Sequence, residues 1–171
     1  MKTAETFETR SPEETEALAA RIARETAPGT IFLLRGDLGA GKTAFTRGFA
    51  RGLGIQEPVS SPTFTIVQEY AFGDSRMLYH MDLYRIADSD AALAFGIDDF
   101  LFDRNVICLI EWPERAEDLY PADAVNVEIE HTAEENRRII RIRRGDIFRP
   151  QHMEPGQDNH QRRQHYHRAA A

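Results

Sequence analysis

The sequence contains little cysteine and no long apolar run, and each scarcity excludes a class of protein. One cysteine among 171 residues cannot form an internal disulfide, and Cys108 lies within the apolar run VICLI, which predicts a buried packing residue. No apolar run approaches the ~20 residues of a membrane span. The first ten residues lack the apolar segment of a secretory signal. We therefore expect a cytoplasmic protein with no membrane association.

Basic residues are also too few for the whole protein surface to bind nucleic acid. The net charge is −7, so any contact with nucleic acid must be local. The best candidate is residues 137–149, RRIIRIRRGDIFR, where a strand would turn Ile140 and Ile142 inward and Arg141 and Arg143 outward. An ordinary solvated strand face explains the same pattern.

Length and composition predict one domain followed by a tail. The hydrophobic content of 42% is that of a globular protein, and we place the domain at residues 1–150. Residues 151–171 have no apolar periodicity and hold four of the six histidines. Their spacing matches no closed set of metal ligands. We expect this His- and Arg-containing tail to be disordered.

The stretch GDLGAGKT fits the phosphate-binding pattern G-x-x-x-x-G-K-[ST]. Its glycines allow backbone N–H groups to converge on an anion at the start of a helix. Lys42 would reach the β- and γ-phosphates, and the Thr43 hydroxyl would ligate Mg²⁺. The predicted nucleotide-binding residues of this loop are Gly36, Asp37, Leu38, Gly39, Ala40, Gly41, Lys42 and Thr43.

The surroundings of the loop support this interpretation. Residues 31–35, IFLLR, suit a buried parallel strand, and Phe45, Phe49 and Leu53 recur every four residues on one face of a helix. Lys42 is one of only two lysines, the other being Lys2, in a chain with 21 basic residues. A turn without a ligand is therefore a weak alternative.

The rest of the chain predicts an α/β fold. A helix begins at SPEET, with Ser11 as N-cap and Glu14 closing a capping box, and ends at the PG of residues 28–29. A hairpin joins strands 65–72 and 76–86, and a short helix and a loop occupy 89–103. A buried strand over 105–112 and an antiparallel pair over 124–132 and 137–144 complete the elements.

Polar groups near these elements are candidates for catalysis. Glu111 ends the apolar run VICLI, where a magnesium-nucleotide site needs a carboxylate; a strand-end glutamate facing water is the alternative. If HMDLYR forms a strand, His80, Asp82 and Tyr84 lie on one face of it. This face would be either one wall of a functional site or the exposed polar face of an edge strand. The segment SSPTF offers hydroxyl groups at Ser60, Ser61 and Thr63, which would contact a γ-phosphate or Mg²⁺. An ordinary turn is the alternative interpretation of this segment.

The motifs GDLGAGKT, VSSPTF, HMDLYR and LIEWPE, in this order, resemble the TsaE family, small ATPases of bacterial tRNA N6-threonylcarbamoyladenosine modification. The resemblance implies a P-loop NTPase-like three-layer fold with a mixed, largely parallel central sheet. It also implies ATP hydrolysis, Mg²⁺ ligation by Thr43 and Glu111, a hydrolytic role for Asp82, and nucleotide contacts near Ser11 and Thr15. With the loop lysine included, the candidate catalytic residues are Lys42, Asp82 and Glu111. Because the sequence shows no lid and no acceptor pocket, we expect hydrolysis to be slow without partner proteins. The implied partners are TsaD- and TsaB-type proteins, through which contact with tRNA would be mainly indirect.

Two other functions fit a phosphate loop. A stand-alone small-molecule kinase would close an Arg-bearing lid over the phosphates, but the segment after Glu111 leaves little room for one. A nucleotide-gated binding module without turnover would not need Asp82 and Glu111. Assays of ATP hydrolysis distinguish these functions.

Overall fold

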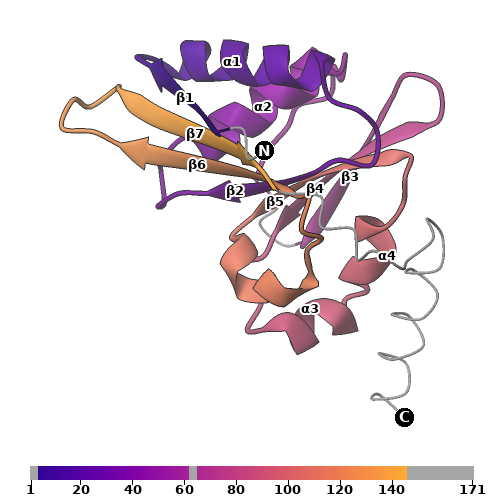
Figure 1. The fold of residues 1–171 in the computed structure, drawn as a ribbon. Coiled ribbons are helices and arrows are strands. Elements are labelled where there is room, and N and C mark those ends of the chain that lie inside the picture. The colour runs from indigo at the N-terminus through magenta and orange to yellow at the C-terminus, as the bar shows by residue number, and fades with distance from the viewer. Residues whose placement is uncertain (1–3, 62–64, 146–171) are drawn as a thin grey trace.

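The computed structural model describes residues 4–61 and 65–145, which form a seven-stranded sheet between two layers of helices (Figure 1). The predicted domain end at residue 150 and the tail 151–171 lie outside the described residues. The elements in chain order are β1 (Ala4–Thr9), α1 (Pro12–Arg24), β2 (Ile31–Arg35), α2 (Lys42–Gly52), β3 (Val67–Phe72), β4 (Arg76–Asp82), α3 (Ser89–Ala94), α4 (Ile97–Leu101), β5 (Val106–Glu111), the 3₁₀ helix η1 (Pro113–Leu119), β6 (Val125–His131) and β7 (Arg138–Arg144).

The centre of the sheet is parallel and its flanks are antiparallel. The strand order is β1-β7-β6-β2-β5-β4-β3. β6, β2, β5 and β4 run parallel, whereas β7 pairs antiparallel with β6 and β1, and β3 with β4. The carboxyl ends of the four central strands therefore meet at one edge, which we call the carboxyl edge. The mixed sheet expected from the resemblance is confirmed.

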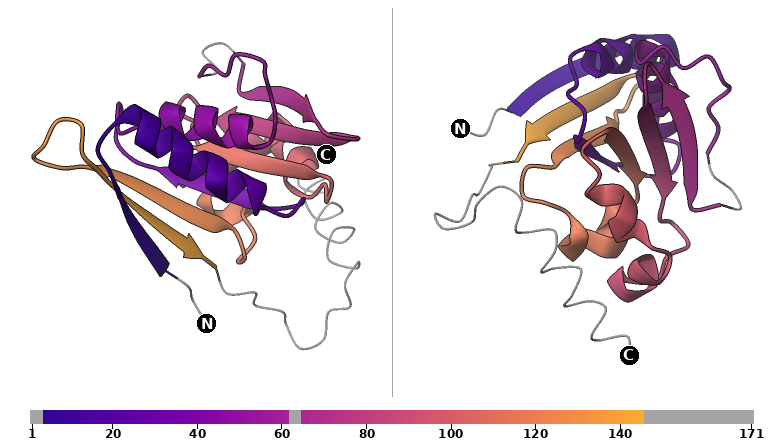
Figure 2. Two further views of the ribbon diagram at one scale, coloured as in Figure 1. Left: turned by 90° about the horizontal axis from the view of Figure 1, so that it is seen from above. Right: turned by 90° about the vertical axis from the view of Figure 1, so that its right-hand side faces the viewer.

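Alternation along β2 shows how the sheet separates two cores. Phe32 and Leu34 join one buried cluster with residues of α1 and α2. Ile31 and Leu33 join a second cluster with residues of α3, α4 and η1. Figure 2 (left) shows α1 and α2 over one face, and Figure 1 shows α3 and α4 below the other. The three-layer arrangement follows from this run of apolar side chains.

Helix α1 begins as the sequence predicts but ends earlier. The Ser11 side chain accepts the N–H of Glu14 at 3.1 Å, and Pro12 is the first helical residue. The Glu14 carboxylate accepts the N–H of Arg10 at 2.6 Å, one residue before the N–H used in a standard capping box. The helix ends at Arg24, before the predicted Pro-Gly turn.

Helices α1 and α2 approach each other unusually closely. A Cβ atom added to Gly48 would lie 2.1 Å from the carbonyl oxygen of Glu16, and one added to Gly52 would lie 2.4 Å from that of Ala20. Only glycine fits at these two positions of α2. Sequence reasoning missed this pair, although four-residue spacing of glycines on a helix is a visible signal.

The hairpin of β3 and β4 is confirmed, but β4 is shorter than predicted. It ends at Asp82 because the Asp82 carboxylate accepts the N–H of Tyr84 at 2.9 Å and turns the chain. Residues 89–103 hold two short helices where one was predicted. Strand β1 was not predicted, because its partner β7 is distant in sequence.

The predicted antiparallel pair corresponds to β6 and β7. Ile140 and Ile142 are buried, as expected. The outward Arg141 lies 2.7 Å from Glu130, and Arg143 forms an ion pair with Glu128. This strand face is therefore neutralised locally rather than a free basic surface.

Two further expectations can be compared with the fold. Cys108 is buried in the second cluster, as predicted. Within residues 4–61 and 65–145, no helix combines the length and apolar character required to cross a membrane.

Candidate functional site

The predicted phosphate loop connects β2 to α2 at the carboxyl edge. Gly39 and Gly41 have φ angles of 77° and 117°, left-handed values that favour glycine. The Ala40 N–H donates to the Asp37 carbonyl at 3.0 Å, which tightens the turn. A Cβ on Gly36 would lie 2.6 Å from the Ile129 carbonyl oxygen of β6. The strand, loop and helix expected from the sequence are all present.

Lys42 begins α2 and is buried beside the loop. Its ammonium donates to the Gly36 carbonyl at 2.6 Å and lies 3.8 Å from the ring centre of Trp112. Burial lowers the pKa of Lys42, while the carboxylates of Glu111, Glu114, Asp82 and Asp37 act in the opposite direction. The ammonium is therefore held in a partly desolvated acidic setting, where phosphate charge would interact with it strongly.

Two hydroxyl groups meet beside the loop. The Thr43 Oγ1 lies 3.1 Å from the Ser61 Oγ, with either atom able to donate. Ser61 belongs to the SSPTF segment, so the structure brings this one of its predicted hydroxyl groups to the loop. Thr63 lies outside the described residues.

Glu111 ends β5 beside the strand that leads into the loop. It is opposite Leu34 of β2 and Asp82 of β4 in the parallel register. Glu111 is only 3% exposed, so the alternative of a glutamate facing water is wrong. Its Oε2 lies 3.1 Å from the Nε2 of the buried His80.

The His80 contact leaves one ring nitrogen without a partner. With Glu111 ionised, its carboxylate accepts the Nε2–H of His80. The Nδ1 of His80 is buried and has no hydrogen-bond partner among the described residues. His80 is thus placed to orient the Glu111 carboxylate, and it does not connect this carboxylate to a longer hydrogen-bond network among the described residues.

Asp82 ends β4 next to Glu111, with His80 two residues earlier in the same strand. Burial raises the pKa of Asp82, opposed by the hydrogen bond from the Tyr84 N–H; the Glu111 charge raises it further. The predicted alignment with Tyr84 is wrong, because Tyr84 follows the strand end and is 52% exposed. The Tyr84 ring instead lies 5.0 Å from that of Trp112.

Ser11 and Thr15 lie near the same edge but have local roles in the structure. β1 runs in the same direction as β6 through its pairing with β7, so the turn after Thr9 reaches the carboxyl edge. The Ser11 hydroxyl caps α1, and the buried Thr15 hydroxyl lies 2.7 Å from that of Thr9. Their predicted nucleotide contacts stay predictions.

Sequence reasoning missed two residues that contact the site. Trp112 has a φ of 56°, a left-handed value that is uncommon for a bulky residue, and its indole covers Lys42. Its place directly after Glu111 was the available signal. Arg138 donates from Nε to the Ala40 carbonyl at 2.9 Å, a contact that no local pattern reveals.

The residues present suit a nucleotide phosphate with Mg²⁺. No group of three or more His, Cys, Asp or Glu side chains suited to a metal occurs in the described parts of the chain. Instead the edge offers the Thr43 and Ser61 hydroxyls, two carboxylates and a glycine-rich loop. These hard oxygen donors fit a magnesium ion that keeps water and phosphate ligands.

Comparison with known proteins identifies the family. The family model for "Threonylcarbamoyl adenosine biosynthesis protein TsaE" matches residues 9–139. A Bacillus subtilis (strain 168) protein named tRNA threonylcarbamoyladenosine biosynthesis protein TsaE is 44% identical over 133 residues, 78% of this chain and 82% of that protein. The protein of the same name from Treponema pallidum (strain Nichols) is 38% identical over 131 residues, 76% and 94% of the two chains.

A solved structure agrees with the sequence matches. The crystal structure of Bacillus subtilis YdiB superposes with a TM-score of 0.69 at 32% identity, and the match covers 100% of this chain and 99% of that one. The family model spans well over half of the chain and includes the loop, Asp82 and Glu111. This chain therefore belongs to the TsaE family.

Proposed function

We propose that this protein binds and hydrolyses ATP with Mg²⁺, and that hydrolysis drives or resets a TsaD/TsaB-type complex that forms N6-threonylcarbamoyladenosine at position 37 of tRNAs. The observation that carries the proposal is the meeting of the phosphate loop with Asp82 and Glu111 at one sheet edge. The relatives' names, which specify tRNA threonylcarbamoyladenosine biosynthesis, support the pathway.

The loop residues would bind the phosphates. The N–H groups of residues 36–43 would surround them at the positive end of α2. Lys42, already buried and aimed across the loop at Gly36, would balance the β- and γ-phosphate charge. Thr43 and Glu111 would hold Mg²⁺, by ligation or through water, and the bound ion would neutralise charge that develops on the transferred phosphoryl group.

Asp82 is the carboxylate that we assign to the attacking water. Glu111 already engages His80 through Oε2, whereas Asp82 is half-buried and accepts the N–H of Tyr84. Burial raises the pKa of Asp82, which makes it a stronger base for a proton of the water molecule. Asp82 would thus orient or deprotonate water in line with the γ-phosphate.

The surface suits a subunit that acts through other proteins. The net charge is −7, and the outward arginines of β7 are paired with glutamates of β6. Direct contact with tRNA would therefore be minor. In the segment after Glu111, the described chain forms η1 and then β6, which leaves little room for the lid of a small-molecule kinase.

The test measures phosphate release and tRNA modification with the same preparations. ATP hydrolysis is followed for the chain alone, with TsaD- and TsaB-type proteins, and with tRNA added. We expect slow release alone and faster release with the partners. Asp82→Asn should retain ATP affinity but stop multiple-turnover modification, because its side chain keeps the size and loses the charge.

Other outcomes would contradict specific parts of the proposal. Transfer of the γ-phosphoryl group to a small molecule would indicate a kinase. ATP binding without phosphate release under any condition would indicate a nucleotide-gated module. Modification by Asp82→Asn at the wild-type rate would remove Asp82 from catalysis, and loss of ATP binding would place it in the binding site instead.

A further inference from the structure

The turn between β6 and β7 lies against the outside of the phosphate loop. Because β6 runs parallel to β2, its carboxyl end reaches the same edge as the loop. The backbone of β6 contacts the loop at its first glycine, where the Ile129 carbonyl leaves no room for a Cβ on Gly36. The other contact comes from Arg138, the first residue of β7.

Arg138 joins the phosphate loop to the turn through backbone carbonyls. Its Nε donates to Ala40 at 2.9 Å, and its Nη1 donates to Glu135 at 2.6 Å and to Arg137 at 3.0 Å. No ion pair of Arg138 with a described carboxylate is found. The guanidinium thus acts as a rigid donor of hydrogen bonds to the main chain.

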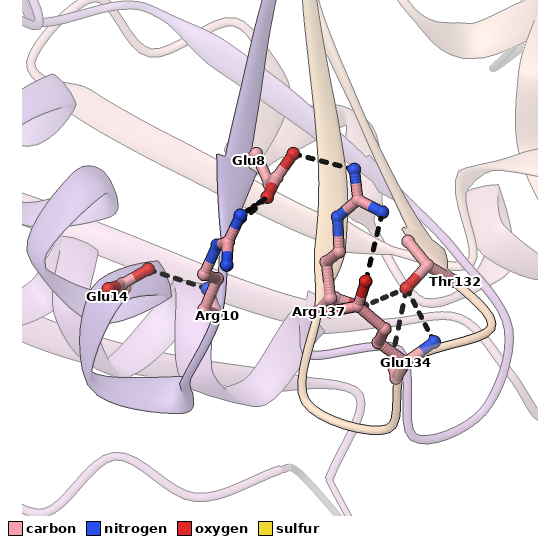
Figure 3. Close-up of polar contacts among 6 residues, drawn as sticks. All are labelled: Glu8, Arg10, Glu14, Thr132, Glu134 and Arg137. Carbon is pink, nitrogen blue, oxygen red and sulfur yellow. Dashed lines mark hydrogen bonds and ion pairs between the residues drawn. The ribbon is translucent and has the colours of Figure 1, made fainter.

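The turn that carries Arg138 is itself held in place, as Figure 3 shows. The neighbouring Arg137 lies 2.8 Å from Glu8 of β1. Thr132 Oγ1 accepts the Glu134 N–H at 3.1 Å and lies 3.4 Å from the Arg137 carbonyl. Arg138 therefore reaches the loop from an anchored backbone.

The bond to Ala40 fixes the direction of the next N–H group. In a planar trans peptide, the C=O of one residue and the N–H of the following residue point in opposite directions. Arg138 holds the Ala40 carbonyl outward, toward the β6–β7 turn. The Gly41 N–H must then point to the other side, and it makes no hydrogen bond to another described residue.

Without that bond, the peptide is free to rotate. Gly41 has a φ of 117°, and glycine occupies both positive and negative φ values at similar free energy. A reversed peptide would direct the Ala40 carbonyl, rather than the Gly41 N–H, at an incoming phosphate. An oxygen facing a phosphate would repel it.

We propose that Arg138 is a positioning residue that holds the Ala40–Gly41 peptide with its N–H facing the phosphate site. This inference rests on the proposed nucleotide binding. It assigns Arg138 no contact with the nucleotide and no part in the reaction. Its effect is to prepare the loop before a nucleotide arrives.

The experiment compares ADP binding by Arg138→Met and by the control Arg141→Met. Methionine keeps an unbranched apolar stem and removes every donor. Arg141 lies in the same strand but is paired with Glu130 of β6 instead. We expect ADP affinity to fall about tenfold in Arg138→Met, near the upper limit for one hydrogen bond, and to stay unchanged in the control.

A second measurement separates positioning from general destabilisation. In protein labelled with ¹⁵N-glycine, the Gly41 amide signal should shift or broaden in Arg138→Met before ADP is added. The signals of Gly48 and Gly52, within α2, should stay in place. Arg138→Gln, whose shorter side chain also loses the contact with Ala40, provides a second variant if Arg138→Met does not fold.

Four outcomes decide the inference. Wild-type ADP affinity in either folded variant would overturn it, as would weaker affinity with an unchanged Gly41 amide. If the wild-type protein itself fails to bind ADP, the proposed function fails, and this is visible before any variant is compared. Weaker binding together with a changed Gly41 signal would support it.

Discussion

The two helical layers hold the sheet in different ways. On one face, α1 and α2 have 13 and 11 residues and pack backbone against backbone at Gly48 and Gly52. On the other face, α3, α4 and η1 have six, five and seven residues. The first layer is therefore fixed by close contact over several turns, and the second consists of short segments over apolar side chains.

This difference separates the supports of the candidate site. The phosphate loop leads directly into α2, so its position depends on the tight layer. Asp82 and Glu111 instead end β4 and β5 and are aligned by the parallel register. The short helices cover these strands without supplying a residue of the loop. Changes in the two layers should therefore have different effects on stability and on nucleotide binding.

The largest expected effect comes from Gly48→Ala in the tight layer. The new methyl group would lie 2.1 Å from the Glu16 carbonyl oxygen, so α1 must move away from α2. Overpacking of this kind costs roughly 3 kcal/mol, which corresponds to a fall of about 10 °C in melting temperature for a domain of this size. Differential scanning calorimetry measures it.

The matched control places a larger group in the other layer. Ala94 ends α3 and is exposed, so Ala94→Leu should change the melting temperature by no more than ~2 °C. Equal losses in the two variants would show that the layers do not differ in packing tolerance.

A second prediction tests the loop without changing the packing of α1 on α2. Lys42→Met should weaken ATP binding by about 100-fold, since a hydrogen bond to a charged group contributes ~1.5–3 kcal/mol. The melting temperature should not fall much, because burial already lowers the pKa of Lys42 and disfavours its charged form in the fold. Isothermal titration calorimetry gives the affinity.

Unchanged ATP affinity in Lys42→Met would refute the assignment of the loop. Lost affinity with a large fall in melting temperature would instead show that the Lys42 contacts with Gly36 and Trp112 are structural.

A third prediction concerns the strand-end carboxylates. Glu111→Gln keeps the shape and a possible contact with His80 but removes the charge next to the predicted metal. ATP affinity should fall about tenfold with Mg²⁺ present, as for a charge-assisted interaction of ~1.4 kcal/mol. With EDTA, the affinity of the variant should match that of the wild type. Equal losses in both conditions would make Glu111 a structural residue.

Local patterns were sufficient to predict the parts of this molecule whose signals lie close together in sequence. The phosphate loop has fixed spacing, and the apolar runs of β2 and β5 predicted two adjacent buried strands. Glu111 was found because it ends such a run. The strand register places Asp82 beside it, and the hydrolytic role that the resemblance implies for Asp82 stays a prediction.

The missed features depend on contacts between distant residues. β1 has one partly buried apolar residue, Phe7, and exists through pairing with β7. Arg138 and Ala40 are 98 residues apart, and Gly48 matters only because α1 packs on it. The short β4 resulted from a local turn at Asp82 that competes with strand extension. Sequence patterns describe elements better than the contacts that join them.

The smallest expected effect tests whether the short-helix layer opens by itself. Cys108 belongs to β5 and packs under that layer, with its Sγ 3.6 Å from the Phe100 carbonyl of α4, and burial raises its pKa to about 12. Alkylation at pH 8 therefore requires an opening that exposes the thiol. Because α3 and α4 are short, we expect them to separate locally without unfolding of the tight layer.

The labelling rate of Cys108 should then be the same in the wild type and in Gly48→Ala, measured by mass spectrometry well below either melting temperature. If opening is global, the loss of ~3 kcal/mol in Gly48→Ala should accelerate labelling by about 100-fold or more. A rate that follows global stability would show that both layers form one cooperative unit, despite their different packing.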